Sequence, residues 1–486
     1  MPTKSRCRSL WRIAASFSFA ACLLAQPPGE AARAWRVKNE KAIVAEFLDF
    51  LAIPNVARDI ERPFIARNAD WIVAAFAKRG IQARKLTVDK APPVIFAEWK
   101  TPGATETIMF YVHYDGQPVD PSKWTVTEPF TPKVVGDRIY ARSASDDKAP
   151  IIALLAAIDA GVKPKANIKF FFEGEEEAGS ARVGEIIRKC KPLLDADVWL
   201  FCDGPVHQSR RQLIAFGARG SIGFDLTIYG PNRELHSGHY GNWAPNPAQM
   251  LMTLVASMRN DDGLTLIDGF GDGAMPLSAL EKQAVADAPD IGAELMRELS
   301  LGRTLGDGEK IEMLVNRPLL NLRGVSSRAV GRAARNIVPS TATASFDIRL
   351  VKGLDGRVAL ERVIKHVRGR GYHVVDKDPD AATLRAHPKV AKISSAEGGY
   401  NAVRASMDLP ISKKVIDAVE SVRGPAVKVP TMGGSLPMAV FEELLQRPLI
   451  IVPIANHDNN QHSHDENIRI QNLWDGIETM AALLAM

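Results

Sequence analysis

The chain has 486 residues, more than one hydrophobic core comfortably holds, so two domains are expected. Its 46% hydrophobic and 24% charged residues, with no low-complexity tract, describe an ordinary globular protein. The net charge of +5 is slight for this length and is partly carried by the N-terminus, which excludes a charge-based case for nucleic-acid binding.

The N-terminus resembles an export signal. Basic residues precede an apolar run from Ile13 to Ala25, and Ala32-Arg-Ala34 is one candidate cleavage motif. A signal of this kind predicts that residues 1–34 are removed and that the exported protein, periplasmic or extracellular, begins near Trp35. The apolar run is too short for a membrane span, so no transmembrane segment is expected in the mature form. Cys22 loosely resembles a lipoprotein acylation site, which leaves a lipid anchor as an alternative.

Helix and strand patterns alternate in the first part of the chain. This alternation predicts an α/β layer with functional residues at strand ends. Helices are predicted over residues 39–51 and 63–80, and strands over residues 82–88, 94–99 and 107–112.

The first candidate ligands follow these strands. The strand over 107–112 runs into His113-Tyr-Asp115, and alternate residues of extended chain point to the same side. Asp115 can therefore orient His113 as a metal ligand, although a surface histidine without a role is the alternative. Next, Asp146 and Asp147 precede an apolar helix, where one can cap the helix and the other can bridge two cations.

A glutamate cluster follows the next apolar run, Ile168-Lys-Phe-Phe-Phe172. Crowded carboxylates repel one another, so the run Glu173-Gly-Glu175-Glu176-Glu177 indicates a metal, a raised pKa or both, with a solvated acidic loop as the alternative. The apolar Val198-Trp-Leu-Phe201 then leads to Asp203. Together with the late His462, these strand ends predict a two-metal hydrolase site.

The ordered motifs are similar to those of the dinuclear zinc aminoacylase/carnosinase superfamily of metallopeptidases, in its dipeptidase branch. The superfamily includes cytosolic nonspecific dipeptidase, carnosine dipeptidase, glutamate carboxypeptidase and succinyl-diaminopimelate desuccinylase. The likeness runs from about residue 39 to the C-terminus. It rests on His113-x-Asp115, Ser145-Asp146-Asp147-Lys148, Glu173-Gly-x-Glu176-Glu177-Ala-Gly-Ser180, Asp203 and Gln461-His462-Ser463.

The resemblance implies a pair of metal ions in each subunit. Five nitrogen and oxygen donors suit two zinc ions, with manganese or cobalt as replacements. One ion is expected at His113 and Asp203, and the other at Glu177 and His462. Asp146 is expected to bridge the two ions.

The catalytic roles come from the same resemblance. Glu176 is expected to be the general base, which accepts a proton from a metal-bridging water and passes it to the leaving amine. Asp115 is expected to orient His113. The peptide bond that joins Asp146 to Asp147 is expected to be cis.

An inserted second domain is predicted between two parts of the catalytic domain. The pattern of half-buried strands over 220–229 and 341–350, with helices over 247–258 and 357–367, resembles the family's ferredoxin-like α+β lid, which commonly mediates a homodimer. The fold class expected is thus α/β, with a mixed, largely parallel sheet flanked by helices, plus this lid. The predicted boundaries are 35–217 and 381–486 for the catalytic domain and 218–380 for the lid.

Substrate contacts are also assigned by resemblance. In Glu234-Leu-His236-Ser-Gly238, His236 matches a histidine that reaches across the dimer to stabilise the tetrahedral oxyanion. Asn336 and Arg349 match lid positions that contact the substrate, where an arginine can bind a C-terminal carboxylate through two hydrogen bonds. Arg404 is a second candidate for binding a substrate carboxylate.

A glycine-rich loop completes the predicted substrate site. Gly434 and Ser435 lie in a segment similar to the substrate loop of the dipeptidase branch, where glycines let backbone amides approach a ligand. That branch often has a glutamate where this chain has Met432.

These inferences predict a dimeric metallohydrolase that cleaves the amide bond of dipeptides or short peptides. An N-acyl amino acid deacylase is one alternative, distinguished by its substrates. A catalytically silent binding protein on the same fold is the other, and an intact Glu176 with a complete ligand set argues against it.

Overall fold

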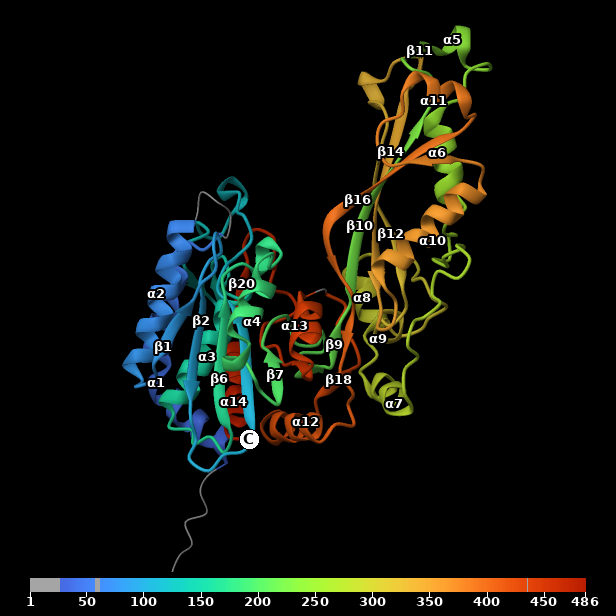
Figure 1. Ribbon diagram of the computed structural model, residues 1–486. Coiled ribbons are helices and arrows are strands. Elements are labelled where there is room, and N and C mark those ends of the chain that lie inside the picture. The colour runs from blue at the N-terminus through green and yellow to red at the C-terminus, as the bar shows by residue number, and fades with distance from the viewer. Residues whose placement is uncertain (1–26, 57–61, 435) are drawn as a thin grey trace, which may run out of the picture.

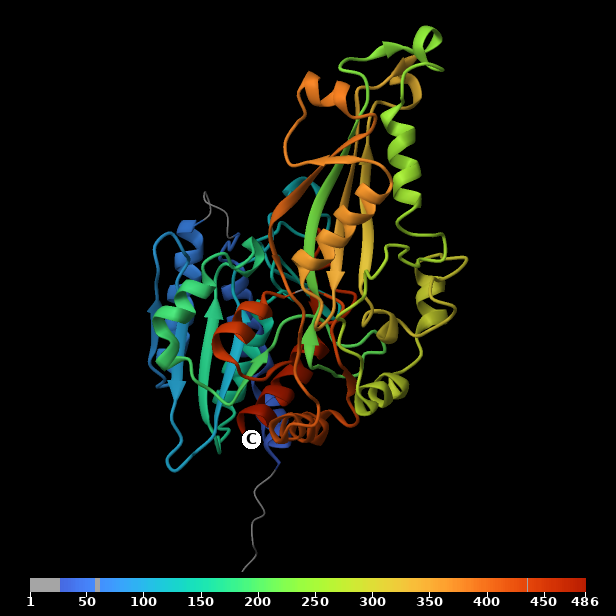
Figure 2. The ribbon, with the colours of Figure 1, turned by 45° about the vertical axis from the view of Figure 1, so that its right-hand side comes forward.

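The structure is a computed structural model that describes residues 27–56, 62–434 and 436–486. A broad α/β lobe lies beside an elongated lobe that projects away from it (Figure 1, Figure 2). The elongated lobe is inserted between strands of the α/β lobe, which is therefore assembled from the two ends of the chain.

An eight-stranded mixed sheet forms the centre of the α/β lobe. Strands β6, β3 and β7 run parallel in its middle, while β1 and β2 are antiparallel at one edge. The expected mixed, largely parallel sheet is confirmed. In sheet order the strands are β1 (Ala83–Leu86), β2 (Val94–Trp99), β6 (Asn167–Glu173), β3 (Thr107–His113), β7 (Val198–Phe201), β19 (Leu449–Ile451), β8 (Leu213–Ala215) and β18 (Val427–Val429).

Helices cover both faces of this sheet because its central strands are apolar on both sides. Along β3, Phe110 and Val112 enter one core, while Met109 and Tyr111 enter the other. The first core is covered by α1 (Pro28–Leu51), α2 (Arg62–Lys78), α3 (Lys148–Asp159), α12 (Pro410–Arg423) and α14 (Ile470–Leu484), and the second by α4 (Val183–Cys190) and α13 (Met438–Leu445).

Helix α1 runs without a break across the predicted cleavage motif at Ala32-Arg-Ala34. Ala32 is fully buried in the first core. The Arg33 guanidinium donates two hydrogen bonds, of 2.9 and 2.7 Å, to the Glu478 carboxylate in α14. Cleavage before Trp35 would remove these contacts from the folded domain, so the packing argues against a mature chain that begins there.

The elongated lobe is built on a five-stranded sheet in the order β12-β14-β10-β16-β15. Its main elements follow one another as β10, α6, β12, β14, α10 and β16, the βαββαβ order of a ferredoxin-like unit. Helices α6 and α10 pack over the buried Phe224, Leu226 and Phe346. The bounds are β10 (Gly220–Tyr229), α6 (Pro247–Ala256), β12 (Leu319–Ser326), β14 (Thr341–Leu350), α10 (Gly356–Gly369), β15 (His373–Val375) and β16 (Val390–Tyr400).

This lobe extends beyond its predicted boundary at residue 380. Strand β16 pairs antiparallel with β10 and parallel with β15, so residues 390–400 belong to the inserted sheet. The strand is hard to recognise because serines and the pair Gly398-Gly399 interrupt its apolar alternation. The chain re-enters the α/β lobe at β17 (Val403–Arg404), which pairs with β9 (Gly217–Ala218).

Three short helices lie at the base of the elongated lobe, next to the α/β lobe (Figure 1). They are α7 (Ala279–Asp287), α8 (Gly292–Glu298) and α9 (Ile311–Leu314). An ion pair of 3.1 Å joins Glu281 of α7 to Nε of Arg404. The insertion therefore contributes residues to the surface of the α/β lobe as well as a projecting sheet.

Candidate active site

Three parallel strands deliver polar residues to one edge of the central sheet. β3 ends at His113, β6 ends beside it at Glu173, and Asp203 follows β7. Because the carboxyl ends of parallel strands share an edge, residues far apart in the chain meet there. A short 3-10 helix, Glu176–Ala178, follows β6 and carries part of the glutamate cluster.

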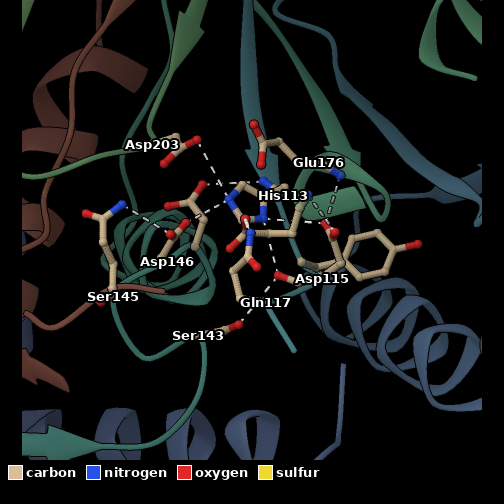
Figure 3. A network of polar contacts seen from close by, with 12 residues as sticks. His113, Asp115, Gln117, Ser143, Ser145, Asp146, Glu176 and Asp203 are labelled. Atoms are coloured by element: carbon tan, nitrogen blue, oxygen red, sulfur yellow. Dashed lines mark hydrogen bonds and ion pairs between the residues drawn. The ribbon is translucent and has the colours of Figure 1, made fainter. Parts of the chain in front are cut away.

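His113 and neighbouring aspartates form the first half of the site. The Nε2 atom of His113 lies 2.9 Å from Oδ1 of Asp146 and 3.7 Å from Oδ2 of Asp203 (Figure 3). Potential ligand atoms of His113, Asp147 and Asp203 also lie within 4.8 Å of one another. All four side chains are buried, and the Asp146–Asp147 peptide is cis.

The second half of the site forms around the other oxygen of Asp146. The Nε2 atom of His462 lies 3.0 Å from Oδ2 of Asp146 and 3.4 Å from Oε2 of Glu177. His462 has a φ of 62°, in the left-handed region that non-glycine residues adopt mainly at special sites. Each carboxylate oxygen of Asp146 thus faces one histidine, as expected of a carboxylate placed between two cations.

The electrostatics of this cluster fit bound positive charge. Burial and the nearby Asp146 raise the pKa of Asp203 to about 6 and the pKa of Glu177 to about 8. Burial also raises the pKa of Asp147, whose Oδ1 has no hydrogen-bond partner among the described residues. Positive charge between these carboxylates would offset both the cost of their burial and their mutual repulsion. Imidazole nitrogens and carboxylate oxygens suit zinc, manganese or cobalt.

Asp115 connects the first histidine to the glutamate loop. Its carboxylate oxygens accept hydrogen bonds from the backbone N–H groups of Glu176, at 3.2 Å, and Glu177, at 2.9 Å. Nδ1 of His113 lies 3.2 Å from the carbonyl oxygen of Asp115 and 3.5 Å from its Oδ1. These contacts turn Nε2 of the ring toward the cluster and hold the glutamate loop beside it.

Glu176 stands next to the metal-ligand cluster, which consists of His113, Asp146, Asp147, Glu177, Asp203 and His462. It belongs to neither group of candidate metal ligands. Its partly buried side chain lines the same pocket as Asp146, Asp203 and His462. Burial raises the pKa of the Glu176 carboxyl well above its ordinary value. A raised pKa suits a carboxylate that accepts a proton near neutral pH.

Sequence reasoning missed Glu466, which ties two loops of the site together. Its fully buried carboxylate accepts hydrogen bonds of 3.0 to 3.1 Å from the backbone N–H groups of Ser143, Ser145 and Asp146. It also pairs with the Arg142 guanidinium at 2.6 Å. The turn that carries Asp146 is thus held by the loop that carries the second histidine. Those donors lie 320 to 323 residues upstream, so no local pattern links them to Glu466.

A pocket of about 420 Å³ opens beside the cluster. Gly433 and Gly434 of the predicted substrate loop lie on its wall, whereas Ser435 lies outside the described residues. Ile311 and Glu312 of α9 line another side, so the insertion helps to form the pocket. Small-molecule sites commonly occupy about 300–1,000 Å³, so a dipeptide-sized ligand can be held here.

Two predicted substrate residues lie far from this pocket in the same chain. His236 belongs to β11 (Leu235–His236), which pairs with β13 (Ile337–Val338) just after Asn336. β11 lies at the far tip of the elongated lobe (Figure 1). Both side chains are exposed. Within one chain, the structure does not bring these two residues to the metal-ligand cluster.

The two predicted carboxylate-binding arginines have partners within the chain. Nε of Arg349 lies 2.9 Å from Oδ2 of Asp347. Arg404 pairs with Glu281 and donates hydrogen bonds to the carbonyl oxygens of Met275 and Pro276. Neither arginine lines the pocket beside the cluster.

Known proteins resemble this chain over most of its length. The Cys-Gly metallodipeptidase of Schizosaccharomyces pombe is 26% identical over 463 residues, which cover 91% of this chain and 94% of that protein. The Beta-Ala-His dipeptidase of Homo sapiens is 27% identical over 403 residues, which cover 80% of this chain and 76% of that protein. A solved M20 family metallo-carboxypeptidase from Sulfolobus solfataricus has a TM-score of 0.77 and 28% identity, over 91% of this chain and 98% of that one.

The comparisons correct the expected location. Long matches are to Cys-Gly metallodipeptidases of yeasts, and nothing in these matches indicates export. The prediction of an exported, periplasmic or extracellular enzyme is therefore wrong. The small residues read as a cleavage motif belong to the packed helix α1. Residues 1–26, with the apolar run and Cys22, lie outside the described residues, and no described helix is long and apolar enough to cross a membrane.

Residues 109–486 match the family described as Peptidase family M20/M25/M40. This span contains His113, Asp146, Glu177, Asp203 and His462. The match agrees with the motif-based resemblance to dinuclear metallopeptidases, and the dipeptidase relatives agree with the branch inferred from the motifs. The chain belongs to peptidase family M20/M25/M40, as a metallopeptidase of its dipeptidase branch.

Proposed function

We propose that this metallopeptidase hydrolyses dipeptides with the help of two divalent metal ions, most simply zinc. His113 and Asp203 would hold one ion, and Glu177 and His462 would hold the other. Asp146 would bind both ions. Manganese or cobalt would suit the same donors. The observation that carries the proposal is the position of Asp146, whose two carboxylate oxygens lie 2.9 and 3.0 Å from the Nε2 atoms of the two histidines.

When bound, such ions polarise the amide carbonyl and lower the pKa of the attacking water. In this proposal Glu176 takes a proton from that water and returns it to the leaving amine. Its place on the pocket wall, outside both groups of candidate ligands, supports this role. Asp115 keeps the His113 ring and the glutamate loop in place through the contacts described above.

We also propose that the enzyme acts as a homodimer joined through the elongated lobe. Strand β12 lies at the edge of its sheet and exposes Leu322 and Val325, with exposed fractions of 40% and 46%. An exposed apolar edge of this kind is a surface that a second copy can cover. Met252 of α6, a helix of the same lobe, is also 46% exposed.

His236 would serve the site of the other subunit in such a dimer. Its Nδ1 accepts a hydrogen bond of 3.1 Å from the N–H of Gly238, which leaves Nε2 to carry a proton outward. An outward N–H donor at an exposed tip suits stabilisation of an oxyanion supplied by another chain. Asn336 beside it and Arg349 are proposed substrate contacts, whereas the partners of Arg404 within the chain favour a structural role.

The test is metal content together with hydrolysis of matched dipeptides and N-acetyl amino acids, before and after chelation. The proposal expects two metal equivalents per subunit and dipeptide cleavage that disappears on chelation and returns with zinc. Cleavage of N-acetyl amino acids alone would show a deacylase instead. A bound metal pair without turnover of either class would show a binding protein.

A further inference from the structure

The pocket beside the cluster contains one carboxylate that the mechanism does not use. Glu312 of α9 lines this pocket and is 6% exposed. It comes from the insertion, whereas the metal-ligand candidates come from the α/β lobe. Buried carboxylates are normally paired with a cation, so the partners of Glu312 decide what this part of the pocket can bind.

The hydrogen bonds of His207 identify it as a neutral partner. Nδ1 of His207 accepts a hydrogen bond of 3.1 Å from the backbone N–H of Ser209, and it lies 2.8 Å from Oγ of the same residue, a hydroxyl that can also donate to it. A backbone N–H can only donate, so Nδ1 carries the lone pair and the ring proton lies on Nε2. Nε2 then donates to Oε1 of Glu312 at 3.0 Å. His207 therefore orients Glu312 without neutralising its negative charge.

The lysine and arginine nearest to Glu312 in sequence have other partners. Nζ of Lys310 donates to the carbonyl oxygens of Ala286 and Ala288. The Arg317 guanidinium pairs with Glu309 at 2.6 Å. Within the described residues, no lysine or arginine lines the pocket, and His207 is the only ion-pair partner of Glu312. The carboxylate therefore faces the pocket with uncompensated charge.

The rest of the wall is mostly apolar. Val206, Leu213, Val315 and Val429 line the pocket together with the side chain of Met432. These residues favour an aliphatic stem, because burying apolar surface is favourable at about 25 cal/mol per Å². Apolar walls around one uncompensated carboxylate select a group with an apolar stem and a positively charged end.

We propose that Glu312, oriented by His207, binds a cationic group of the substrate, an ammonium or guanidinium. This inference rests on the proposed function and names the substrate class of the same site. The cation has two sources in a dipeptide: the side chain of a lysine or arginine, or the α-amino group. Either cation would make the same contact with the Glu312 carboxylate. The two sources are distinguished by which substrates are cleaved more slowly when that carboxylate is removed.

The test compares kcat/KM of the wild-type enzyme and Glu312→Gln, both loaded with metal. The substrates are dipeptides with lysine or norleucine at either position and glycine at the other, plus acetyl-norleucyl-glycine, measured as an inhibitor where it is not cleaved. A charge-assisted contact predicts a loss of about 10- to 100-fold for the substrates whose cation meets Glu312.

A loss confined to lysine at one position identifies the side chain as the source. Equal losses for lysyl-glycine and norleucyl-glycine, with no change for the acetylated peptide, identify the α-amino group. Equal effects on all substrates, or none, overturn the inference. Glu309→Gln is the matched control, because its carboxylate lies three residues away and pairs with Arg317, and its substrate ratios should not change.

Wild-type kinetics keep the inference testable if Glu312→Gln does not fold. When the recognised charge is removed from the substrate, kcat/KM of the wild-type enzyme should then fall, or the inhibition constant rise, by about tenfold or more. Values that change neither with the lysine charge nor with acetylation contradict the inference. Absence of any metal-dependent cleavage would instead refute the proposed function, so the two failures are distinguishable.

Discussion

The edge of the central sheet and the tip of the elongated lobe hold their functional candidates in opposite ways. At the sheet edge, His113, Asp146 and Asp203 are buried, and Nε2 of His113 lies 2.9 and 3.7 Å from the carboxylate oxygens of the two aspartates. At the tip, His236 is exposed, and its Nδ1 accepts a local hydrogen bond from the N–H of Gly238. One chain can thus preorganise the metal-ligand cluster, whereas in the proposed dimer the tip would meet the substrate of the other subunit.

The largest expected effect concerns the proposed base. Glu176→Gln keeps the size of the side chain but removes its ability to accept a proton. Turnover of dipeptides should fall by about 10²- to 10⁴-fold. Metal content should stay at two equivalents, because Glu176 belongs to neither group of ligands. Activity close to wild type would remove Glu176 from the mechanism.

The next effect tests whether the tip serves another subunit. His236→Ala should lower kcat by about 10²- to 10³-fold, as loss of one oxyanion donor does, without loss of metal. Mixing it with Glu176→Gln should restore part of the activity, because one site of each mixed dimer then has both residues. Mixtures no more active than the separate variants would contradict action across a dimer.

A smaller effect is expected at Glu466, which holds the Asp146 turn. Glu466→Gln places an amide N–H₂ where backbone N–H groups now donate, so the turn should lose its support. Metal affinity should weaken by about 10- to 100-fold, measured by competition with a chelator. Glu443→Gln, at an exposed position, is the control and should bind metal as the wild type does. Equal affinities of the two variants would show that the turn needs no such support.

The smallest effect is a dependence of stability on pH that metal should remove. The pKa of Asp203 is raised to about 6 and the pKa of Glu177 to about 8, so the metal-free folded state binds protons that the unfolded state releases. Stability of the chelated protein should therefore fall as the pH rises from about 5 to 8. The zinc-loaded protein should lack this slope. Urea unfolding at several pH values measures both, and a metal-free stability that rises over this range would contradict the assignment.

The contrast also explains what could be predicted from sequence. The α/β fold and the strand-end residues were predictable because His113 and Glu173 end short apolar strands and Asp203 lies just after another. Glu466 was not, since its contacts join loops more than 300 residues apart. The pair of His207 and Glu312 spans 105 residues and two lobes, so spacing carries no sign of it.

Two segments show how local patterns mislead. Ala32-Arg-Ala34 resembles a cleavage site, but these residues belong to helix α1, where the small side chain of Ala32 packs closely on the core and Ala34 is exposed. Strand β16 carries serines and glycines, and its place in the inserted sheet depends on pairing with β10, which lies about 170 residues earlier. In both cases tertiary packing decides the structure.

The most direct test of the central claim is a metal titration of the chelated protein, followed by dipeptide hydrolysis at each step. If Asp146 joins two metal sites, activity should reach its maximum only as the second equivalent of zinc binds. Asp146→Asn should weaken both binding events together, because each oxygen of Asp146 faces one histidine. Full activity at one equivalent, or loss of a single binding event in the variant, would contradict the account.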